Sequence, residues 1–365
     1  MTEKKNKTRK GYPARALTLC LAIFMLVFML AYADSAARHA RRGLTLIATT
    51  LIPSLFPFMV ISDVLCRCGF ISAVGRFVAR PMRGLFGISG EGAGVMLLGM
   101  LCGFPIGAKC AVSLCDSGEI SKTECVRLIS LSSLPSAAFS ISTVGVSLFC
   151  DFRVGVCLYL ATVLSAIIVG VIDARLHKSG NDDTLRKKEK PRADFGVGEL
   201  TEAVSSSAVG VIKISGFVLF FSVLLGVISE LSFVDDLCKG AIALFFSAFE
   251  LTSGVARAAA VSDIREALTL CAFALGWSSF SIHFQIMSVA AGRGLELAGY
   301  IASKLFQGVI SAALVFLFSA FLPMPTKNTG GMILTSGMPS TLSAIILTVF
   351  SLSLAVAIAK KARTW

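Results

Sequence analysis

The stretch GMLCGFPIGAKCAVSL, residues 99–114, is an apolar segment that is interrupted where a membrane-spanning helix would be continuous. Glycine recurs at every fourth position, and a proline and a lysine lie close by: Gly99, Gly103, Pro105, Gly107 and Lys109. At membrane depth, backbone departs from helical geometry only where protein or a hydrated cavity satisfies the released amide groups. The sequence therefore predicts that this break faces other protein or water.

The composition is that of a membrane protein. Of the 365 residues, 55% are hydrophobic and 15% are charged, whereas soluble domains have about 25% charged residues. A bilayer-crossing helix needs about 20 apolar residues. Blocks of about this length lie at 16–33, 44–61, 154–172, 209–228, 301–322 and 342–358. We predict an all-α, polytopic helical protein of the cell membrane with multiple passes.

The formal net charge of +12 comes from basic residues that flank the apolar blocks. This placement is typical of the positive-inside rule, with membrane lipid as a secondary partner, and it argues against nucleic acid as a partner. We expect residues 1–42 to form a cytoplasmic N-terminus and a first transmembrane helix. A cleavable signal peptide is the alternative, because Ala31-Tyr32-Ala33 follows a basic stretch and an apolar core.

No catalytic or metal-binding pattern is visible in the chain. Most of the eleven cysteines lie in apolar segments, where thiols act as small hydrophobic groups. The close pair Cys66 and Cys68 lacks the partners of a zinc site. A Ser-His-Asp order, an H-E-x-x-H motif and a P-loop are all missing. The sequence therefore predicts neither an enzyme nor a cofactor or metal.

Two halves of similar order follow the first helix. We expect a first repeat over 43–172, a cytoplasmic linker over 173–200, a second repeat over 201–322, and a C-terminal transmembrane helix and tail over 323–365. Three segments of the second half echo the first: 215–233 matches 53–70, 249–254 matches 86–91, and 275–289 matches 102–114. Because the linker is cytoplasmic, the second repeat starts on the other side. Such inverted repeats place binding sites near the midplane, where broken helices meet.

Each repeat is expected to contain an interfacial helix and a re-entrant helical hairpin. In the first repeat, 71–85 alternates apolar residues with arginines at helical spacing, which suits a helix lying in the interface. Residues 92–116 form the hairpin, with Gly103, Phe104, Pro105 and Gly107 at or near its turn. These are candidate solute-binding residues, because a turn of this kind exposes amide groups and helix ends that can hold an anion or a polar solute. The glycines form a ridge that allows close packing. An ordinary kinked span is the alternative.

Lys109 has two interpretations. A lysine within an apolar segment faces a partner or water, so it could contact an anionic or carbonyl group of a solute or replace a coupling cation. Alternatively, it lies near the cytoplasmic surface and extends its ammonium into water.

The second break, 276–285, has more polar side chains than the first. Its candidate solute-binding residues are Gly276, Trp277, Ser278, Ser279, Ser281, His283 and Gln285. His283 could also take part in proton-linked chemistry. The alternative is a set of interhelical hydrogen bonds, each worth about 1 kcal/mol. A further polar segment, Glu250 to Gly254, is expected to cap the preceding helix rather than to contact a ligand.

The order of motifs resembles the YlbJ-type sporulation integral membrane proteins. The motifs are LIPSLFPFMVISDVL (51–65), RPMRGLFGISGEG (80–92), GFPIGAK (103–109), SGEISKTECVRLISL (117–131) and GWSSFSIHFQ (276–285). The resemblance covers most of 43–322 and implies a role in spore formation, including the cortex. It also implies membership of the nucleoside-recognition, or Gate, group and distant kinship with concentrative nucleoside transporters. The chain departs from the family at 131–136, where an asparagine is usual.

Two functions follow from these observations. The first is transport of a small polar solute, such as one similar to a nucleoside, during sporulation, since the paired breaks within inverted repeats suggest a binding site. The second is a membrane scaffold that keeps the fold without transport, since neither break contains an evident carboxylate for a coupling ion. Assembly as a homo-oligomer is compatible with both.

Overall fold

The computed structural model describes residues 12–176, 196–231, 234 and 238–319, and every regular element in them is a helix. The first half contains α2 (Tyr12–Ala31), α3 (Ala33–Leu46), the π-helical η1 (Ile47–Leu51), α4 (Ile52–Arg67), α5 (Phe70–Phe86), α6 (Glu91–Cys102), α7 (Ile106–Asp116), α8 (Lys122–Ser132), the π-helical η2 (Phe139–Leu148) and α9 (Phe152–Leu176). The second half contains α10 (Val197–Ile228), α12 (Lys239–Phe249), α13 (Leu251–Ala259), α14 (Ile264–Trp277), α15 (Ser279–Ala290) and α16 (Ala298–Phe318). The predicted helix at 342–358 and most of the predicted linker lie outside the described residues.

Four helical segments are long and apolar enough to cross a membrane: α9, α10, α16, and α14 with α15, which together form a segment of 27 residues. Two further pairs qualify as bent spans, with a bend of 93° between α2 and α3 and of 87° between α5 and α6. Large apolar side chains such as Phe220 and Phe306 stay exposed on these helices, as expected where lipid replaces water. The prediction of an all-α, polytopic membrane protein is confirmed.

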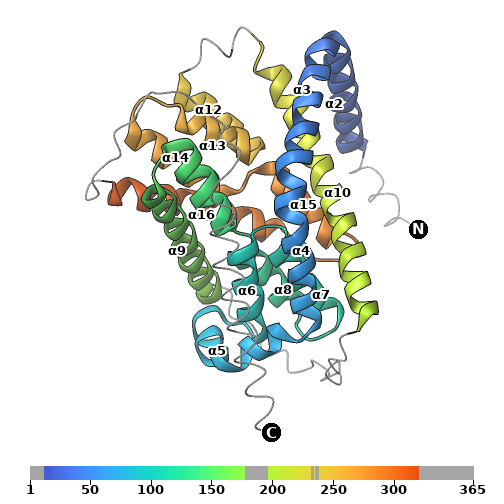
Figure 1. Ribbon diagram of the computed structural model, residues 1–365, viewed down its shortest axis with the longest axis vertical. Coiled ribbons are helices and arrows are strands. Elements are labelled where there is room, and N and C mark those ends of the chain that lie inside the picture. Colours follow the sequence, from blue (N-terminus) through green and yellow to red (C-terminus); the bar gives the residue numbers. More distant parts are fainter. Residues whose placement is uncertain (1–11, 177–195, 232–233, 235–237, 320–365) are drawn as a thin grey trace.

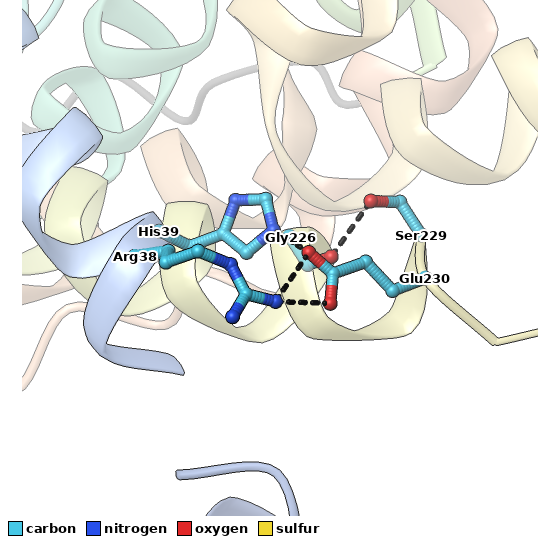
Figure 2. Close-up of polar contacts among 5 residues, drawn as sticks. All are labelled: Arg38, His39, Gly226, Ser229 and Glu230. Atoms are coloured by element: carbon cyan, nitrogen blue, oxygen red, sulfur yellow. Dashed lines mark hydrogen bonds and ion pairs between the residues drawn. The ribbon is translucent and has the colours of Figure 1, made fainter. Parts of the chain in front are cut away.

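Helices α3 and α4 follow one another along one side of the molecule, and α10 packs against both (Figure 1). The predicted boundary at residue 43 falls inside α3. Just beyond α10, the carboxylate of Glu230 accepts a hydrogen bond from Arg38 at 2.9 Å and lies 3.1 Å from His39 Nε2 (Figure 2). The Ser35 hydroxyl, together with Arg38 and His39, lowers the pKa of Glu230 to about 2. The carboxylate therefore stays charged and connects α3 to the end of α10.

Helix α5 is the amphipathic helix that the sequence predicts at 71–85. Ile71 and Met82 are buried, whereas Arg80 and Arg83 are exposed; Phe77, although apolar, is exposed as well. Gly75 lies against the backbone of Gly90, where any side chain would overlap, so α5 approaches the start of α6 closely. Its position at the membrane interface stays a prediction.

The order of elements in the first half recurs in the second. The short helices α6 and α7 pack on each other, and so do α12 and α13 (Figure 1). Each pair precedes an interrupted helix: residues 133–138 separate α8 from η2, and Ser278 separates α14 from α15. Helices α9 and α16 follow, and they pack on one another. The opposite membrane orientation of the two halves stays a prediction.

This arrangement corrects the predicted second hairpin, because α14 and α15 do not fold back on each other. Helix α14 packs on α16 and α13, whereas α15 packs on α10 and α7. The counterpart of LGWSSFSIH (275–283) is LPSAAFSIS (134–142), in the interruption of the first half, rather than 102–114. The prediction failed because the two breaks share apolar and small residues, and these do not determine whether a chain reverses. That depends on which helix each half-segment packs against.

Candidate functional site

The first break, between α6 and α7, docks on the interruption between α8 and η2. Gly103 adopts φ = +79°, which glycine reaches without a steric penalty. The Phe104 amide donates to the Leu134 carbonyl at 2.9 Å. A side chain at Gly103 would lie 2.7 Å from the Ser136 nitrogen, so the tip approaches backbone directly. Pro105 is buried and Phe104 is half-buried, so other parts of the chain enclose the tip.

The glycine ridge continues this contact along α6 and α7. A side chain at Gly99 would overlap the Ser132 carbonyl, and one at Gly107 would lie 2.6 Å from Ser132 Cβ. Ser132 is the last residue of α8. The prediction that the glycines allow close packing on a neighbour is confirmed, and that neighbour is the end of α8.

The second break is built differently, from serines and an aromatic ring. Ser278 and Ser279 have φ of +77° and +76°, a region that costs an L-residue roughly 1–2 kcal/mol. The Trp277 indole donates to the Ala248 carbonyl at 3.2 Å, which ties the break to the end of α12. Gly276 lies against the backbone of α16, where a side chain would come within 2.8 Å of Gly308 Cα.

His283 lies one turn beyond this break and is almost completely buried, with 1% exposed. Its Nδ1 is 2.9 Å from the Tyr300 hydroxyl. Its ring meets the Trp277 ring edge-on, with the ring centroids 4.5 Å apart. The second break therefore positions an imidazole between an indole and a phenol.

Tyr300 begins a polar stripe on α16. Lys304, one turn further on, has no exposed surface. Its ammonium donates to the Ser133 carbonyl in the first-half interruption and to Gln307 Oε1 at 2.7 Å. The Gln307 amide donates in turn to the Thr162 carbonyl of α9 at 3.2 Å. Polar side chains of the second half thus reach backbone carbonyls of the first half.

Several polar atoms around the breaks are buried without a hydrogen-bond partner in the described part of the chain. They are Nε2 of His283 and the hydroxyls of Ser140, Ser247, Ser278, Ser279 and Ser311. A buried polar group without a partner costs roughly 1–3 kcal/mol. Three of these atoms, in Ser278, Ser279 and His283, belong to the second break, which indicates a place where water or a ligand can bind.

Lys109 faces a carboxylate. Its ammonium lies 3.3 Å from Asp63 of α4, and the side chains are 28% and 13% exposed, respectively. Arg67, one turn along α4, lies 3.7 Å from the same carboxylate. The structure thus provides an intramolecular partner for Lys109, and sequence reasoning did not identify Asp63.

A small cavity of about 40 Å³ joins this region to α15. Pro105, Lys109, Gln285 and Ser288 line it, together with residues of α4 and α10. Since a water molecule needs roughly 10–15 Å³ by this measure, the cavity has room for a few waters. Drug-sized ligands occupy pockets of about 300–1,000 Å³. Pro105 and Lys109 from the first break and Gln285 from the second therefore line the same small cavity.

Ser281 and Gln285 are both buried, and the Gln285 amide approaches the Ser281 hydroxyl at 3.5 Å. This contact lies within α15. Glu250 is the N-cap of α13, where its carboxylate accepts hydrogen bonds from the Thr252 and Ser253 amides at 2.9 and 2.7 Å. The carboxylate therefore caps a helix, but that helix is α13, which follows Glu250, and not the preceding helix α12 that the sequence predicted.

The thiols Cys66 and Cys110 lie 2.7 Å apart, so α4 and α7 are close beside the Asp63–Lys109 pair. In the described part of the chain, no group of three or more His, Cys, Asp or Glu could hold a metal ion.

The residues that sequence reasoning missed are mostly on α16. Tyr300, Lys304 and Gln307 complete the polar interior. One signal could have found Lys304: it lies alone in an apolar block, as Lys109 does, and a lysine in such a block needs a partner. The Ser133 and Thr162 carbonyls gave no signal, because every residue carries this group.

The fold and the site together define a multi-pass helical membrane protein with a polar interior where interrupted helices meet. The chain is similar to the protein named "Sporulation integral membrane protein YlbJ" from Bacillus subtilis (strain 168), with 27% identity over 336 residues that cover 82% of each chain. No family model matches the sequence. No solved structure matches it either.

Proposed function

We propose that this chain acts in sporulation by moving a small polar solute across the membrane through the interior between its two interrupted helices. The similarity to a sporulation integral membrane protein supports the process. The buried polar groups at the breaks support the transport step.

One observation carries the transport proposal: polar atoms without partners lie at the break of the apolar segment formed by α14 and α15. His283 Nε2 and the hydroxyls of Ser278 and Ser279 are buried in this way. Polar groups inside a membrane are expensive and typically line a solute or ion pathway. Interrupted helices are the usual place for such sites in transporters.

The solute class follows from these groups and from the resemblance stated above. Hydroxyls, an imidazole and an indole suit a polar solute with a planar ring, such as a nucleoside or a precursor of the spore cortex. Since the cavity beside Lys109 has a volume of only about 40 Å³, the helices around the breaks must separate to admit it.

A scaffold without transport is the second candidate. The observation in its favour is the close packing of the breaks, where Gly99 and Gly107 lie against α8 and Gly276 lies against α16. A protein that only assembles partners needs no internal volume.

Uptake and spore formation, measured together, separate the two candidates. Labelled nucleosides and cortex precursors are supplied to vesicles that contain wild type, His283→Ala, Gly276→Leu or the control Phe284→Ala, whose side chain is exposed. We expect at least a tenfold loss of uptake for the first two variants and none for the control. Spore formation in a null strain should follow uptake. If wild-type vesicles accumulate no solute and both site variants restore sporulation, transport is ruled out.

A further inference from the structure

The buried lysine of α16 has no counter-charge. Lys304 is completely buried, and its ammonium binds two neutral acceptors, the Ser133 carbonyl and Gln307 Oε1. No carboxylate of the described residues lies within ion-pair distance of it. Lys109 differs in this respect, because it has Asp63 at 3.3 Å.

An ammonium that keeps its charge at this depth requires an anion. Removing a charge from water costs several kcal/mol or more unless a partner compensates. Within membranes, charged side chains are therefore paired or face water. Two neutral acceptors occupy two of the three N–H groups of the ammonium and leave one available. The available N–H can therefore donate to a negatively charged group.

The polar groups that follow Lys304 through Tyr300 are also suited to binding an anion. Tyr300 lies one turn away on α16 and contacts His283 at 2.9 Å. Beyond it, His283 Nε2 and the hydroxyls of Ser278 and Ser279 have no hydrogen-bond partner. Hydroxyls donate to oxyanions, and imidazole donates from its protonated nitrogen.

Gln307, which binds Lys304, also lines a small cavity. A cavity of about 20 Å³ is lined by Arg127, Ser130, Ser303 and Gln307, among others. Gln307 binds Lys304 directly and thus lies between the cavity and the ammonium. The guanidinium of Arg127 lies 3.3 Å from Asp173, at the outer part of this cavity.

We propose that Lys304 anchors an oxyanion site, in which the ammonium and the hydroxyls of the second break bind a carboxylate or phosphate group of the solute. This inference rests on the proposed transport function and narrows its solute to an acidic one. When the solute is bound, its oxyanion accepts a hydrogen bond from the N–H of Lys304 that Gln307 and the Ser133 carbonyl leave available.

Tryptophan fluorescence of the purified full-length chain tests the site without requiring transport. The chain has two tryptophans, and Trp277 contacts His283, so a Trp365→Phe background makes Trp277 the only reporter. Acetate and inorganic phosphate are titrated at constant ionic strength, with chloride as the balancing anion and acetamide as the uncharged comparison. We expect a saturable fluorescence change with at least one oxyanion and none with acetamide.

Two variants and one control test whether the fluorescence change comes from oxyanion binding at Lys304. Lys304→Met removes the charge, and Gln307→Glu supplies the missing carboxylate next to it. Both should weaken oxyanion binding at least tenfold. Lys239→Met is the matched control, since it removes an exposed lysine from the apolar helix α12 and should leave binding unchanged. If Lys304→Met does not fold, Gln307→Glu alone decides.

The outcomes separate this inference from the proposed function. Absence of any oxyanion response in wild type, or an unchanged response in Gln307→Glu, overturns the site. Uptake of a neutral solute without an oxyanion response also overturns the site and leaves transport standing. Oxyanion binding that depends on Lys304, in a protein that moves no solute, supports the site and overturns transport.

Discussion

The two halves have helices in a similar order, but different chemical groups hold their breaks in place. In the first half, the tip at Phe104 binds the interruption after α8 through a backbone hydrogen bond to Leu134. In the second half, the interruption binds the end of α12 through the Trp277 side chain. The first half supplies backbone carbonyls to the interior, and the second supplies an imidazole, a phenol and an ammonium. The candidate site is therefore asymmetric, although the order of elements is repeated.

The backbone of the breaks shows the same difference. Where φ is positive in the first break, the residue is glycine, at Gly103. In the second break the residues are Ser278 and Ser279, which keep a hydroxyl in a conformation that disfavours side chains. Strain retained at such a place is typical of functional sites, because a structural turn would use glycine.

The largest effect is expected at the glycines that bring helices together. An alanine in a helix interior is ordinarily more stable than glycine by roughly 0.5–1 kcal/mol, but at Gly107 the added methyl would overlap Ser132. We expect Gly107→Ala to lower the stability of the purified chain by roughly 1–3 kcal/mol. Gly254→Ala, which would overlap Ser247, should have a similar effect. Thermal unfolding measures both.

Gly216→Ala is the control, because a methyl group there would meet nothing within 4 Å. It should be neutral or slightly stabilising. If Gly107→Ala unfolds at the same temperature as Gly216→Ala, the close contact between the first break and α8 does not exist.

A smaller effect is expected for the ion pair in the first half. Removing one partner of a buried pair costs roughly 3–5 kcal/mol, and the partial exposure of Lys109 and Asp63 reduces this to about 2 kcal/mol. We expect Asp63→Asn to be destabilised by that amount and Asp63→Asn/Lys109→Met to recover part of it. Glu202→Gln removes an exposed partner of Arg67 and serves as the control. If the double variant is destabilised by the sum of the effects of its two single substitutions, the two charges are not coupled.

At Ser278, the strained serine of the second break, a substitution should raise the stability instead of lowering it. Replacing Ser278 with glycine relieves a left-handed conformation, so Ser278→Gly should be more stable by about 1 kcal/mol. Its uptake should fall if the hydroxyl binds solute. The reverse change in the first break, Gly103→Ser, should be destabilising. A drop in the unfolding temperature of Ser278→Gly would show that its φ is not positive in the protein.

The smallest effect is expected at the exposed contact between α3 and the end of α10. The folded-state pKa of Glu230 is about 2, below its ordinary value of 4.5, so its charge favours the folded state above pH 4.5. This contribution is lost as the pH falls from 4.5 toward 2. Wild type should therefore unfold at a higher temperature than Glu230→Gln near pH 6, and the difference should disappear near pH 2. Parallel pH profiles for the two proteins would contradict this.

Composition and periodicity predicted the fold class, because a bilayer requires long apolar helices whatever their neighbours. They also predicted the amphipathic α5 and both breaks, since glycine, proline and clustered serines interrupt a helix locally. The partners of the breaks were not predictable in this way. Leu134, Ser133 and Ala248 take part through carbonyls that every residue has, and Asp63 meets Lys109 only because α4 packs on α7.

By itself, the sequence determined that the chain crosses a membrane and that it is interrupted near Gly103 and near Ser278, since both depend on residues close together in the chain. It did not indicate the interruption at 133–138. Only the tertiary structure decided that α6 and α7 pack together while α14 and α15 extend apart, and that Lys304 lies among the breaks without a counter-charge. Packing between distant helices sets these features, and local sequence does not encode which surfaces will meet.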